Sequence, residues 1–474
     1  MNLLKKNILR YLSKKYYHIK HAIITVPTNF FHLQIEGILD ACKASGLDIE
    51  EEEVIKIEKR ANEKLGREIN GGIILDEPSA AALYFLDAIK GIKPDAFDRL
   101  KKGNNLHMLI YDHGGGTLDV SVIKVENIED KGFLINVLAN KGNNKIGGDS
   151  IDLVLMNDLL KKCKLQYPKF EKDLISSTYN KLLMKRYKEE WSAEIWSNIL
   201  RVRGNWKKIA EQAKEDLSTK DNTSINVDLS DIFILDKKNI DHLKDFNITI
   251  SRSTFEDLIG EIIKESEYVI KGAIELANIS YDKIDFIIHT GRSSIIPAIK
   301  NRVTTIFPHI SENQVILHEE RLKICVAKGA VMYALPRNKN KNKVFIVDEG
   351  KKLPHSYGID KPDEDTGTSL VYDEIIKIGT KYPTDNPITK HFNKDDIEGN
   401  KLRLNFYQNS GKHKSFENNR DINKIGDVSI PISEDKPECV LKFEINKNRK
   451  LAITANDKEI KIRPPKLDEN EEWM

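Results

Sequence analysis

Residues 109–122 read LIYDHGGGTLDVSV, and the rest of the chain is best understood from this stretch. An apolar run ends at Asp112, glycines occupy positions 114–116, and apolar residues then alternate with polar ones from Leu118 onward. This pattern predicts two β-strands joined by a glycine-rich turn. Because glycine has no Cβ, the backbone N–H groups of such a turn are open to an anion such as a phosphate.

Two carboxylates flank the predicted turn, Asp112 before it and Asp119 after it, and Thr117 adds a hydroxyl. A carboxylate at this place can hold a divalent cation, directly or through water. The alternative is a tight hairpin whose aspartate only caps the turn. The presence of two carboxylates favours a combined metal and phosphate site, with Asp112 and Asp119 as the metal-binding residues.

The size and composition limit the possible classes of protein. A chain of 474 residues is too long for one core, so two or three domains are expected. A net charge of +2 provides no general attraction to nucleic acid, and no apolar run approaches the roughly 20 residues that cross a bilayer. The four cysteines are far apart and form no CxxC pair, which indicates a reducing compartment. We therefore expect a cytoplasmic protein with neither nucleic acid nor membrane as a partner.

Residues 1–336 alternate short apolar strands with amphipathic helices, which is typical of an α/β protein. A strand at 72–75 runs into Asp76, Glu77, Pro78 and Ser79, and a helix rich in alanine follows. A carboxylate between a strand and a helix is well placed for chemistry, but it is also a common helix cap. We expect further strands at 22–26, 133–139, 222–229 and 285–289, and helices at 30–45, 206–217, 253–278 and 325–335.

The character of the sequence changes in its last third. Residues 337–352 begin with a polar, basic segment without periodicity, which predicts a linker. Short alternating segments separated by turns fill residues 353–465, and they predict an antiparallel β domain. An acidic tail, 466–474, completes the chain.

Six motifs in order resemble the DnaK-type (70-kDa heat-shock) chaperones of the actin-like ATPase superfamily. They are ITVP at 24–27, DEPSAAA at 76–82, DHGGGTLDVS at 112–121, IGGD at 146–149, EQAK at 211–214 and GRSSIIP at 291–297. The later part of the chain looks nearest to the divergent, lidless heat-shock-70-like family 12. The resemblance implies an actin-like (ribonuclease H-like) nucleotide-binding domain followed by a β-sandwich-like substrate-binding domain.

The resemblance also implies ligands and residue roles. ATP or ADP would bind with Mg²⁺, or with K⁺, and unfolded or extended polypeptides and co-chaperones would be partners. Asp112 and Glu77 would be the catalytic residues that position water and metal, and Asp119 would support a cation. The implied nucleotide contacts are Gly114, Gly115, Gly116, Thr117, Gly147, Gly148, Glu211, Lys214, Ser218, Gly291, Arg292, Ser293 and Ser294.

From the residues alone, Glu211 and Lys214 would be an ordinary surface ion pair on a helix, with Ser218 one turn further on. Only the resemblance places this trio at a nucleoside. At neighbouring positions the chain departs from the family pattern. Glu215 stands where the family has a base-stacking arginine, Arg292 replaces a glycine, and Ile295 replaces an arginine.

The family's first phosphate loop and its catalytic lysine have no counterpart in the 474 residues. We therefore expect a nucleotide-binding domain that is incomplete at its N-terminus, with weak or lost ATP hydrolysis. A degenerate pseudo-ATPase that acts as a protein-binding module is the alternative. A sugar or acetate kinase of the same superfamily would share the hairpin, but the β-rich last third argues against it.

Overall fold

The structure is a computed structural model, and it describes the chain in segments. The described residues are 23–27, 30, 32–44, 74–92, 94–128, 132–143, 145–167, 193–228, 246–316, 324–334, 345–347, 351–353, 355–363, 369–397, 399–411, 414–416, 421–433, 438–446, 450–456 and 458–463. The basic start of the predicted linker, at 337–343, and the acidic tail lie outside the described residues. The described helices include none that is both long and apolar enough to cross a membrane.

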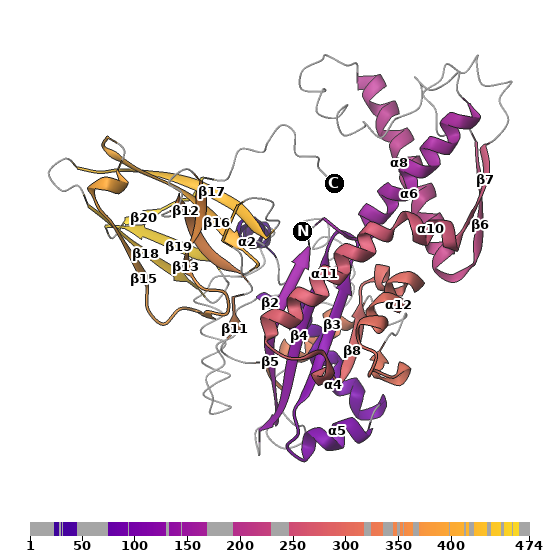
Figure 1. The fold of residues 1–474 in the computed structure, drawn as a ribbon, viewed down its shortest axis with the longest axis horizontal. Coiled ribbons are helices and arrows are strands. Elements are labelled where there is room, and N and C mark those ends of the chain that lie inside the picture. The colour runs from indigo at the N-terminus through magenta and orange to yellow at the C-terminus, as the bar shows by residue number, and fades with distance from the viewer. Residues whose placement is uncertain are drawn as a thin grey trace, which may run out of the picture.

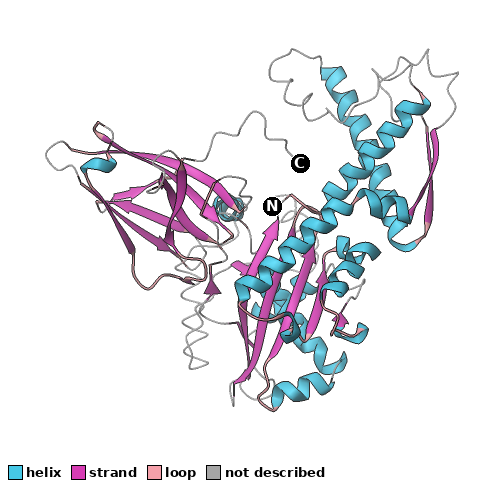
Figure 2. Ribbon diagram, in the orientation of Figure 1, coloured by secondary structure: helices cyan, strands magenta, loops and turns pink. Residues whose placement is uncertain are grey.

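A six-stranded mixed sheet forms the centre of the first domain (Figures 1 and 2). Its strand order is β10-β5-β4-β3-β8-β9, with β3, β4 and β5 antiparallel and the other neighbours parallel. The bounds of these strands are β3 Leu106–His113, β4 Leu118–Ile128, β5 Gly132–Asn143, β8 Phe286–Thr290, β9 Val315–Ile316 and β10 Phe345–Val347.

Both faces of this sheet are covered, which explains why β3 is apolar at successive positions instead of alternating. Leu109 and Tyr111 belong to one hydrophobic cluster, and Met108 and Ile110 belong to another on the opposite face. The first face packs against α6, α8, α11 and α12, and the second against α4 and α5. These helices are α4 Glu77–Ile92, α5 Pro94–Lys101, α6 Gly148–Gln166, α8 Ala193–Thr219, α11 Gly260–Ala277 and α12 Pro297–Ile306.

Helix α4 begins directly after the short strand β2 (Ile74–Asp76), and Asp76 caps it. The Ser79 N–H donates to Asp76 Oδ1 at 2.8 Å, so Asp76 takes the capping role and leaves Glu77 without it. Helix α13 (Cys325–Ala334) packs closely on α4, because a Cβ on Gly329 would lie 1.8 Å from the Ala80 carbonyl oxygen. The absence of a side chain at Gly329 therefore allows the two helix backbones to touch.

The expected single helix at 253–278 is wrong, because two helices occupy this range. Helix α10 (Arg252–Leu258) ends at Ile259, and α11 starts at Gly260. Ile259 leaves helical geometry, with φ −89° and ψ 8°, and it is fully buried. Phe255, Ile259 and Ile262 belong to the same hydrophobic cluster, at the i, i+4 and i+7 spacing that had predicted a single helix.

The other predicted elements of the first domain are present. Strand β1 (Ile24–Val26) pairs in parallel with β2, and α2 (His32–Ala44) packs beside them. Strands β6 (Asn222–Val227) and β7 (Phe246–Ser251) form an antiparallel pair next to α8. Short 3-10 turns occur at η3 Tyr281–Lys283, η4 Arg292–Ile295 and η5 Glu312–Gln314.

The C-terminal domain contains two antiparallel sheets of four strands that share one hydrophobic core (Figure 1). Their strand orders are β13-β12-β16-β17 and β15-β18-β19-β20, and a two-stranded sheet, β11-β14, accompanies them. The bounds are β11 Lys351–Lys352, β12 Ser356–Pro362, β13 Leu370–Ile376, β14 Lys381–Tyr382, β15 Ile388–Phe392, η6 Lys394–Asp396, β16 Lys401–Asn409, β17 Ile422–Pro431, β18 Cys439–Ile445, β19 Leu451–Ala455 and β20 Lys458–Ile460.

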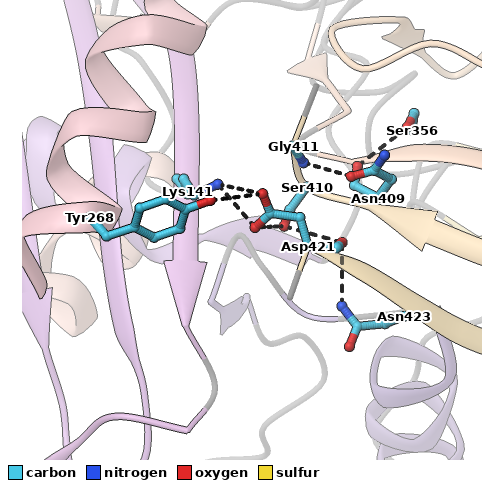
Figure 3. A network of polar contacts seen from close by, with 8 residues as sticks. All are labelled: Lys141, Tyr268, Ser356, Asn409, Ser410, Gly411, Asp421 and Asn423. Carbon is cyan, nitrogen blue, oxygen red and sulfur yellow. Dashed lines mark hydrogen bonds and ion pairs between the residues drawn. The ribbon is translucent and has the colours of Figure 1, made fainter. Parts of the chain in front are cut away.

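The two domains are joined by more than the chain between them. Strand β10, from the predicted linker, adds to the edge of the central sheet beside β5. Lys141 lies near the end of β5, and its Nζ is 3.0 Å from both carboxylate oxygens of Asp421 in the β domain (Figure 3). The Tyr268 hydroxyl of α11 donates to the same carboxylate at 3.2 Å, and the Lys141 ammonium lies 4.8 Å from the Tyr268 ring centre.

This interdomain ion pair is buried, with side-chain exposures of 5% for Lys141 and 9% for Asp421. Glycines on both sides make room for it. A Cβ on Gly272 would lie 2.3 Å from Lys141 Cδ, and a Cβ on Gly411 would lie 2.2 Å from Asp421 Oδ2. The Ser410 hydroxyl also donates to the carboxylate at 3.3 Å. Removal of either charge of a buried ion pair strongly destabilises the protein, because the other charge then stays buried without its counter-charge.

We predict that Asp421→Asn separates the two domains while each stays folded. The variant keeps the shape of the side chain but leaves Lys141 buried without its counter-charge, at a cost of about 3–5 kcal/mol that separation relieves. Small-angle X-ray scattering should give a larger radius of gyration than for the wild type. Asp427→Asn is the control, because Asp427 pairs with the exposed Arg463 inside the β domain. Unchanged scattering for Asp421→Asn would show that this pair does not hold the domains together.

Candidate functional site

The glycine-rich turn between β3 and β4 is formed as the sequence predicts. The Gly114 N–H donates to the Thr117 carbonyl at 2.9 Å and closes the turn. Asp112 and Asp119 are direct cross-strand partners at its base, and the Thr117 hydroxyl donates to Asp119 Oδ2 at 3.3 Å. Asp119 is buried and Asp112 is half-buried. The antiparallel register therefore places the two carboxylates side by side below the glycines.

The carbonyl groups of the turn are bound by two neighbouring elements. The Gly114 oxygen accepts from the Gly148 N–H and from the Ser293 hydroxyl, both at 3.0 Å. The Gly115 oxygen accepts from the Asp149 N–H at 2.6 Å. These bonds connect the hairpin to the first turn of α6 and to η4. Three of the predicted nucleotide-contact segments therefore meet at one place.

The glycine-rich turn, the first turn of α6 and η4 together form a cradle. The space around the glycines shows how this cradle is packed. A Cβ on Gly147 would lie 2.5 Å from the Gly116 carbonyl carbon, so the two backbones are in direct contact. Cβ atoms on Gly115 and Gly116 would meet nothing within 4 Å. The turn is therefore packed on one side by other backbone and open on the other. An open side next to buried carboxylates suits a phosphate with a bound cation.

The turn that leads into η4 approaches the hairpin equally closely. Gly291 has φ +74°, and a Cβ there would lie 2.3 Å from the His113 carbonyl oxygen and 2.7 Å from Asp112 Oδ1. Only glycine fits both this conformation and this space. The Ser294 hydroxyl donates back to the Gly291 oxygen at 2.6 Å and fixes the turn. The family-like GRSS segment is thus held against Asp112 by its backbone.

Helix α8 reaches the cradle through Lys214. Its ammonium lies 2.7 Å from Asp152 Oδ1 of α6 and 3.3 Å from the Gly148 oxygen. Ser218 donates its hydroxyl to the Lys214 carbonyl at 2.8 Å, within the same helix, and Glu211 is exposed. The partner of Lys214 is therefore Asp152, which the sequence reasoning missed. The only signal for Asp152 in the sequence was its place one turn into the helix that follows the IGGD motif.

The carboxylates around the hairpin influence one another. Burial, the largest cause, and the charges of Asp112, Asp119 and Asp76 together raise the pKa of Glu77 from 4.5 to about 8. Burial also raises the pKa of Asp112, to about 6, and a hydrogen bond from Thr290 opposes this shift. These carboxylates therefore share one electrostatic environment. It contains too little positive charge to balance Glu77, Asp112 and Asp119 when all three are ionised.

The negative environment fits a hard cation with water and phosphate as additional ligands. Within the described ranges, no three side chains of His, Cys, Asp or Glu are arranged to hold a metal ion alone. Mg²⁺ commonly keeps several waters and takes only one or two protein carboxylates plus phosphate oxygens. Asp112 and Asp119, which are cross-strand partners, could provide such a partial set.

Two buried histidines below the hairpin were not predicted. His113 and His289 lie on neighbouring strands, with ring centres 5.9 Å and 5.4 Å from the Tyr111 ring. Burial lowers the pKa of each to about 3, so both are neutral at neutral pH. Neither is marked by a motif of its own, and only the apolar character of the flanking strands indicated that these positions are buried.

Comparisons with known proteins agree with the geometry. The family model described as Hsp70 protein matches residues 68–467. The DnaK chaperone protein of Carsonella ruddii is 28% identical over 442 residues, covering 93% of this chain and 59% of the relative. The DnaK chaperone protein of Psychrobacter cryohalolentis is 27% identical over 457 residues, covering 96% of this chain and 57% of the relative. The chain thus spans less than three fifths of the length of these relatives.

Two glycine substitutions should separate folding from ligand binding. Gly115→Ala places a methyl group in open space, so we expect wild-type melting but weaker binding of pyrophosphate or ADP, because the methyl group occupies the ligand side of the turn. Gly147→Ala forces Gly116 to move, so we expect a clear fall in the melting temperature. Differential scanning fluorimetry and calorimetric titration measure the two effects. If a folded Gly115→Ala variant binds pyrophosphate and ADP like the wild type, the ligand does not bind on the open side of the turn at Gly115.

The shifted pKa of Glu77 predicts a pH-dependent stability. Its folded pKa, about 8, lies above its ordinary value of 4.5. The contribution of protonated Glu77 to the free energy of unfolding is therefore fully present below pH 4.5. It is lost as pH rises through 8, because the folded protein must then hold a buried charge. We expect Glu77→Gln to equal the wild type near pH 5 and to exceed it by a few kcal/mol at pH 8.5 in EDTA, since one pKa unit is about 1.4 kcal/mol.

Urea denaturation between pH 5 and 8.5 measures this difference, and Glu261→Gln on the exposed start of α11 is the control. Added Mg²⁺ should reduce the gap, because a cation favours the ionised form of Glu77. A gap that is independent of pH would show that Glu77 is not ionising inside this cluster.

Proposed function

The chain belongs to the Hsp70 protein family, and from this premise we propose that it binds ATP or ADP with Mg²⁺ at the glycine-rich hairpin. One observation carries the proposal. The open faces of Gly115 and Gly116 lie beside the carboxylates of Asp112 and Asp119, while their other sides are closed by backbone from α6 and η4. A phosphate chain with its cation fits such a one-sided cradle.

Each group in the cradle has a role that follows from its position. The N–H groups of residues 115–117 bind phosphate oxygens, and Asp112 orients the water that attacks the terminal phosphate. Glu77 holds a proton at neutral pH in the absence of a cation, because burial and three carboxylates raise its pKa to about 8. Bound Mg²⁺ supplies charge neutralisation at the phosphates. Asp119 supports the cation from the opposite strand.

We propose that hydrolysis is slow. Phosphoryl transfer depends on positive groups that stabilise charge on the transferred phosphate. The Lys214 ammonium, which reaches this cradle from α8, is held by the buried Asp152 and by the Gly148 carbonyl. Release of Lys214 toward a phosphate would leave Asp152 without its partner, which opposes catalysis. ATP binding with little turnover is the expected behaviour.

We also propose that the C-terminal domain is a β-sandwich-like module that binds extended polypeptide clients in the cytoplasm. Its two sheets of four strands share a single core, so it can fold as a unit. The similarity to DnaK chaperone proteins supports the client class. A chain that binds a polypeptide but no nucleotide would instead support the alternative, a pseudo-ATPase that acts as a protein-binding module.

The nucleotide proposal is tested by Asp112→Asn. We expect the variant to keep most ADP affinity in EDTA, to lose the gain in affinity that Mg²⁺ gives the wild type, and to lower residual ATP turnover by roughly 10²-fold. Isothermal titration calorimetry and single-turnover hydrolysis measure these effects. Asp158→Asn is the matched control, because Asp158 pairs with Lys162 along the surface of α6. Equal Mg²⁺ dependence in the wild type and in Asp112→Asn would contradict the proposal.

A further inference from the structure

The ammonium group that α8 brings to the cradle is held by an acid of α6. Lys214 Nζ lies 2.7 Å from Oδ1 of Asp152 and 3.3 Å from the Gly148 carbonyl oxygen. The Lys214 side chain is 14% exposed and that of Asp152 is 3% exposed, so little water reaches the pair. An ion pair in this setting is stronger than one on the surface, because water competes less for either partner.

The same ammonium is close to the glycine-rich turn. A Cβ on Gly148 would lie 3.3 Å from Lys214 Nζ and 3.5 Å from Gly115 Cα, so these two atoms border one small space. A Cβ on Gly115 itself would meet nothing within 4 Å, so Nζ does not reach the open side of the turn at Gly115. Lysine has a flexible four-carbon stem, so a change of rotamer can move Nζ toward an anion on that side.

Asp152 opposes this movement. If the ammonium turned toward a ligand, the Asp152 carboxylate would remain buried without its counter-charge. Burial raises the pKa of Asp152, and the hydrogen bond and charge of Lys214 act against this shift. The ionised form of Asp152 therefore depends on Lys214, and each partner holds the other in place.

A second cation near the cradle is also paired with an acid, but less firmly. Arg292 begins η4, and its Nη1 lies 2.9 Å from Oε1 of Glu215 on α8. These side chains are 55% and 38% exposed, so water can replace either partner and the pair restrains its cation only weakly. Burial therefore distinguishes the pair of Lys214 and Asp152 as the one that can keep a charge away from a ligand.

We propose that Asp152 is an autoinhibitory residue, which keeps the Lys214 ammonium away from phosphate bound at the glycine-rich turn. The inference rests on the proposed nucleotide function and adds a residue that regulates the same site. Asp152 acts only through Lys214, so it is a positioning residue and does not contact the phosphate. Loss of its charge releases the ammonium, which then stabilises negative charge on the ligand and on the transferred phosphate.

The experiment uses the full chain and titrates inorganic pyrophosphate with Mg²⁺ in a calorimeter. Asp152→Asn keeps the shape of the side chain and should bind pyrophosphate about tenfold more tightly than the wild type, the usual worth of a hydrogen bond to a charged group. The affinity should also fall more steeply with added salt, because one more charge then faces the ligand. Single-turnover ATP hydrolysis should be faster in the same variant.

Lys214→Gln tests the inference without any change at Asp152. Because the ammonium does not serve the ligand in the wild type, Lys214→Gln should bind pyrophosphate within about twofold of the wild type. The double variant should match Lys214→Gln, since Asp152 has nothing to release once the ammonium is gone. A purely structural role of Asp152 would not give this dependence on Lys214. If Asp152→Asn does not fold, Lys214→Gln alone decides the question.

Asp158→Asn is the matched control, because it removes one negative charge from the same helix. Asp158 pairs with Lys162 along α6, and their side chains are 18% and 32% exposed. This variant should bind pyrophosphate like the wild type. Melting temperatures without ligand show which variants are folded, and only folded variants are compared.

The outcomes separate the inference from the proposed function. If the wild type binds pyrophosphate and folded Asp152→Asn binds it equally or more weakly, the function stands and the inference fails. A loss of affinity of about tenfold in Lys214→Gln also overturns the inference, because the ammonium would already serve the ligand. A gain from Asp152→Asn that persists without Lys214 overturns it as well, since Asp152 would then act only by its charge.

Two further outcomes concern the wild type. If only Asp152→Asn binds pyrophosphate, the inference stands and the proposed nucleotide binding by the wild type fails. If neither protein binds it, the proposed function fails and the inference fails with it.

Discussion

The contact of three backbone segments without intervening side chains is the constraint on which the candidate site depends. Gly147 lies against Gly116, and Gly291 lies against His113 and Asp112, at distances that exclude a Cβ. The hydrogen bonds from Gly148 and Asp149 to the hairpin carbonyls hold α6 in register with the turn. Because the glycine turn is fixed from behind, its open face does not require further ordering when a ligand binds, which lowers the entropic cost of binding.

The carboxylates give this cradle its electrostatic character. Directly opposed like charges in a β-sheet are destabilising, and Asp112 and Asp119 occupy opposed positions in the register. Neutral His113 and His289 lie below them, so the histidines add no positive charge at neutral pH. The opposed carboxylates therefore repel each other, and a cation bound beside them would reduce this repulsion.

Two ion pairs join distant parts of the chain at similar distances, but burial gives them different effects on stability. Lys141 and Asp421 are 3.0 Å apart and buried between the domains, so removal of either charge leaves the other in an apolar setting. Glu215 and Arg292 are 2.9 Å apart but partly exposed, so water can compensate for a lost partner. The first pair can hold domains together, whereas the second contributes little to stability.

The sequence alone determined the strands and the turn at 109–122, because alternating apolar residues and successive glycines act through local sterics. It also indicated Glu77, Asp112 and Asp119, since carboxylates at strand ends are visible in any single sequence. The tertiary structure decided the partners of Lys214, Glu215 and Lys141, because ion pairs between distant segments leave no local pattern. It also decided the break at Ile259, because the apolar periodicity of the sequence continues across this position and gives no sign of a break.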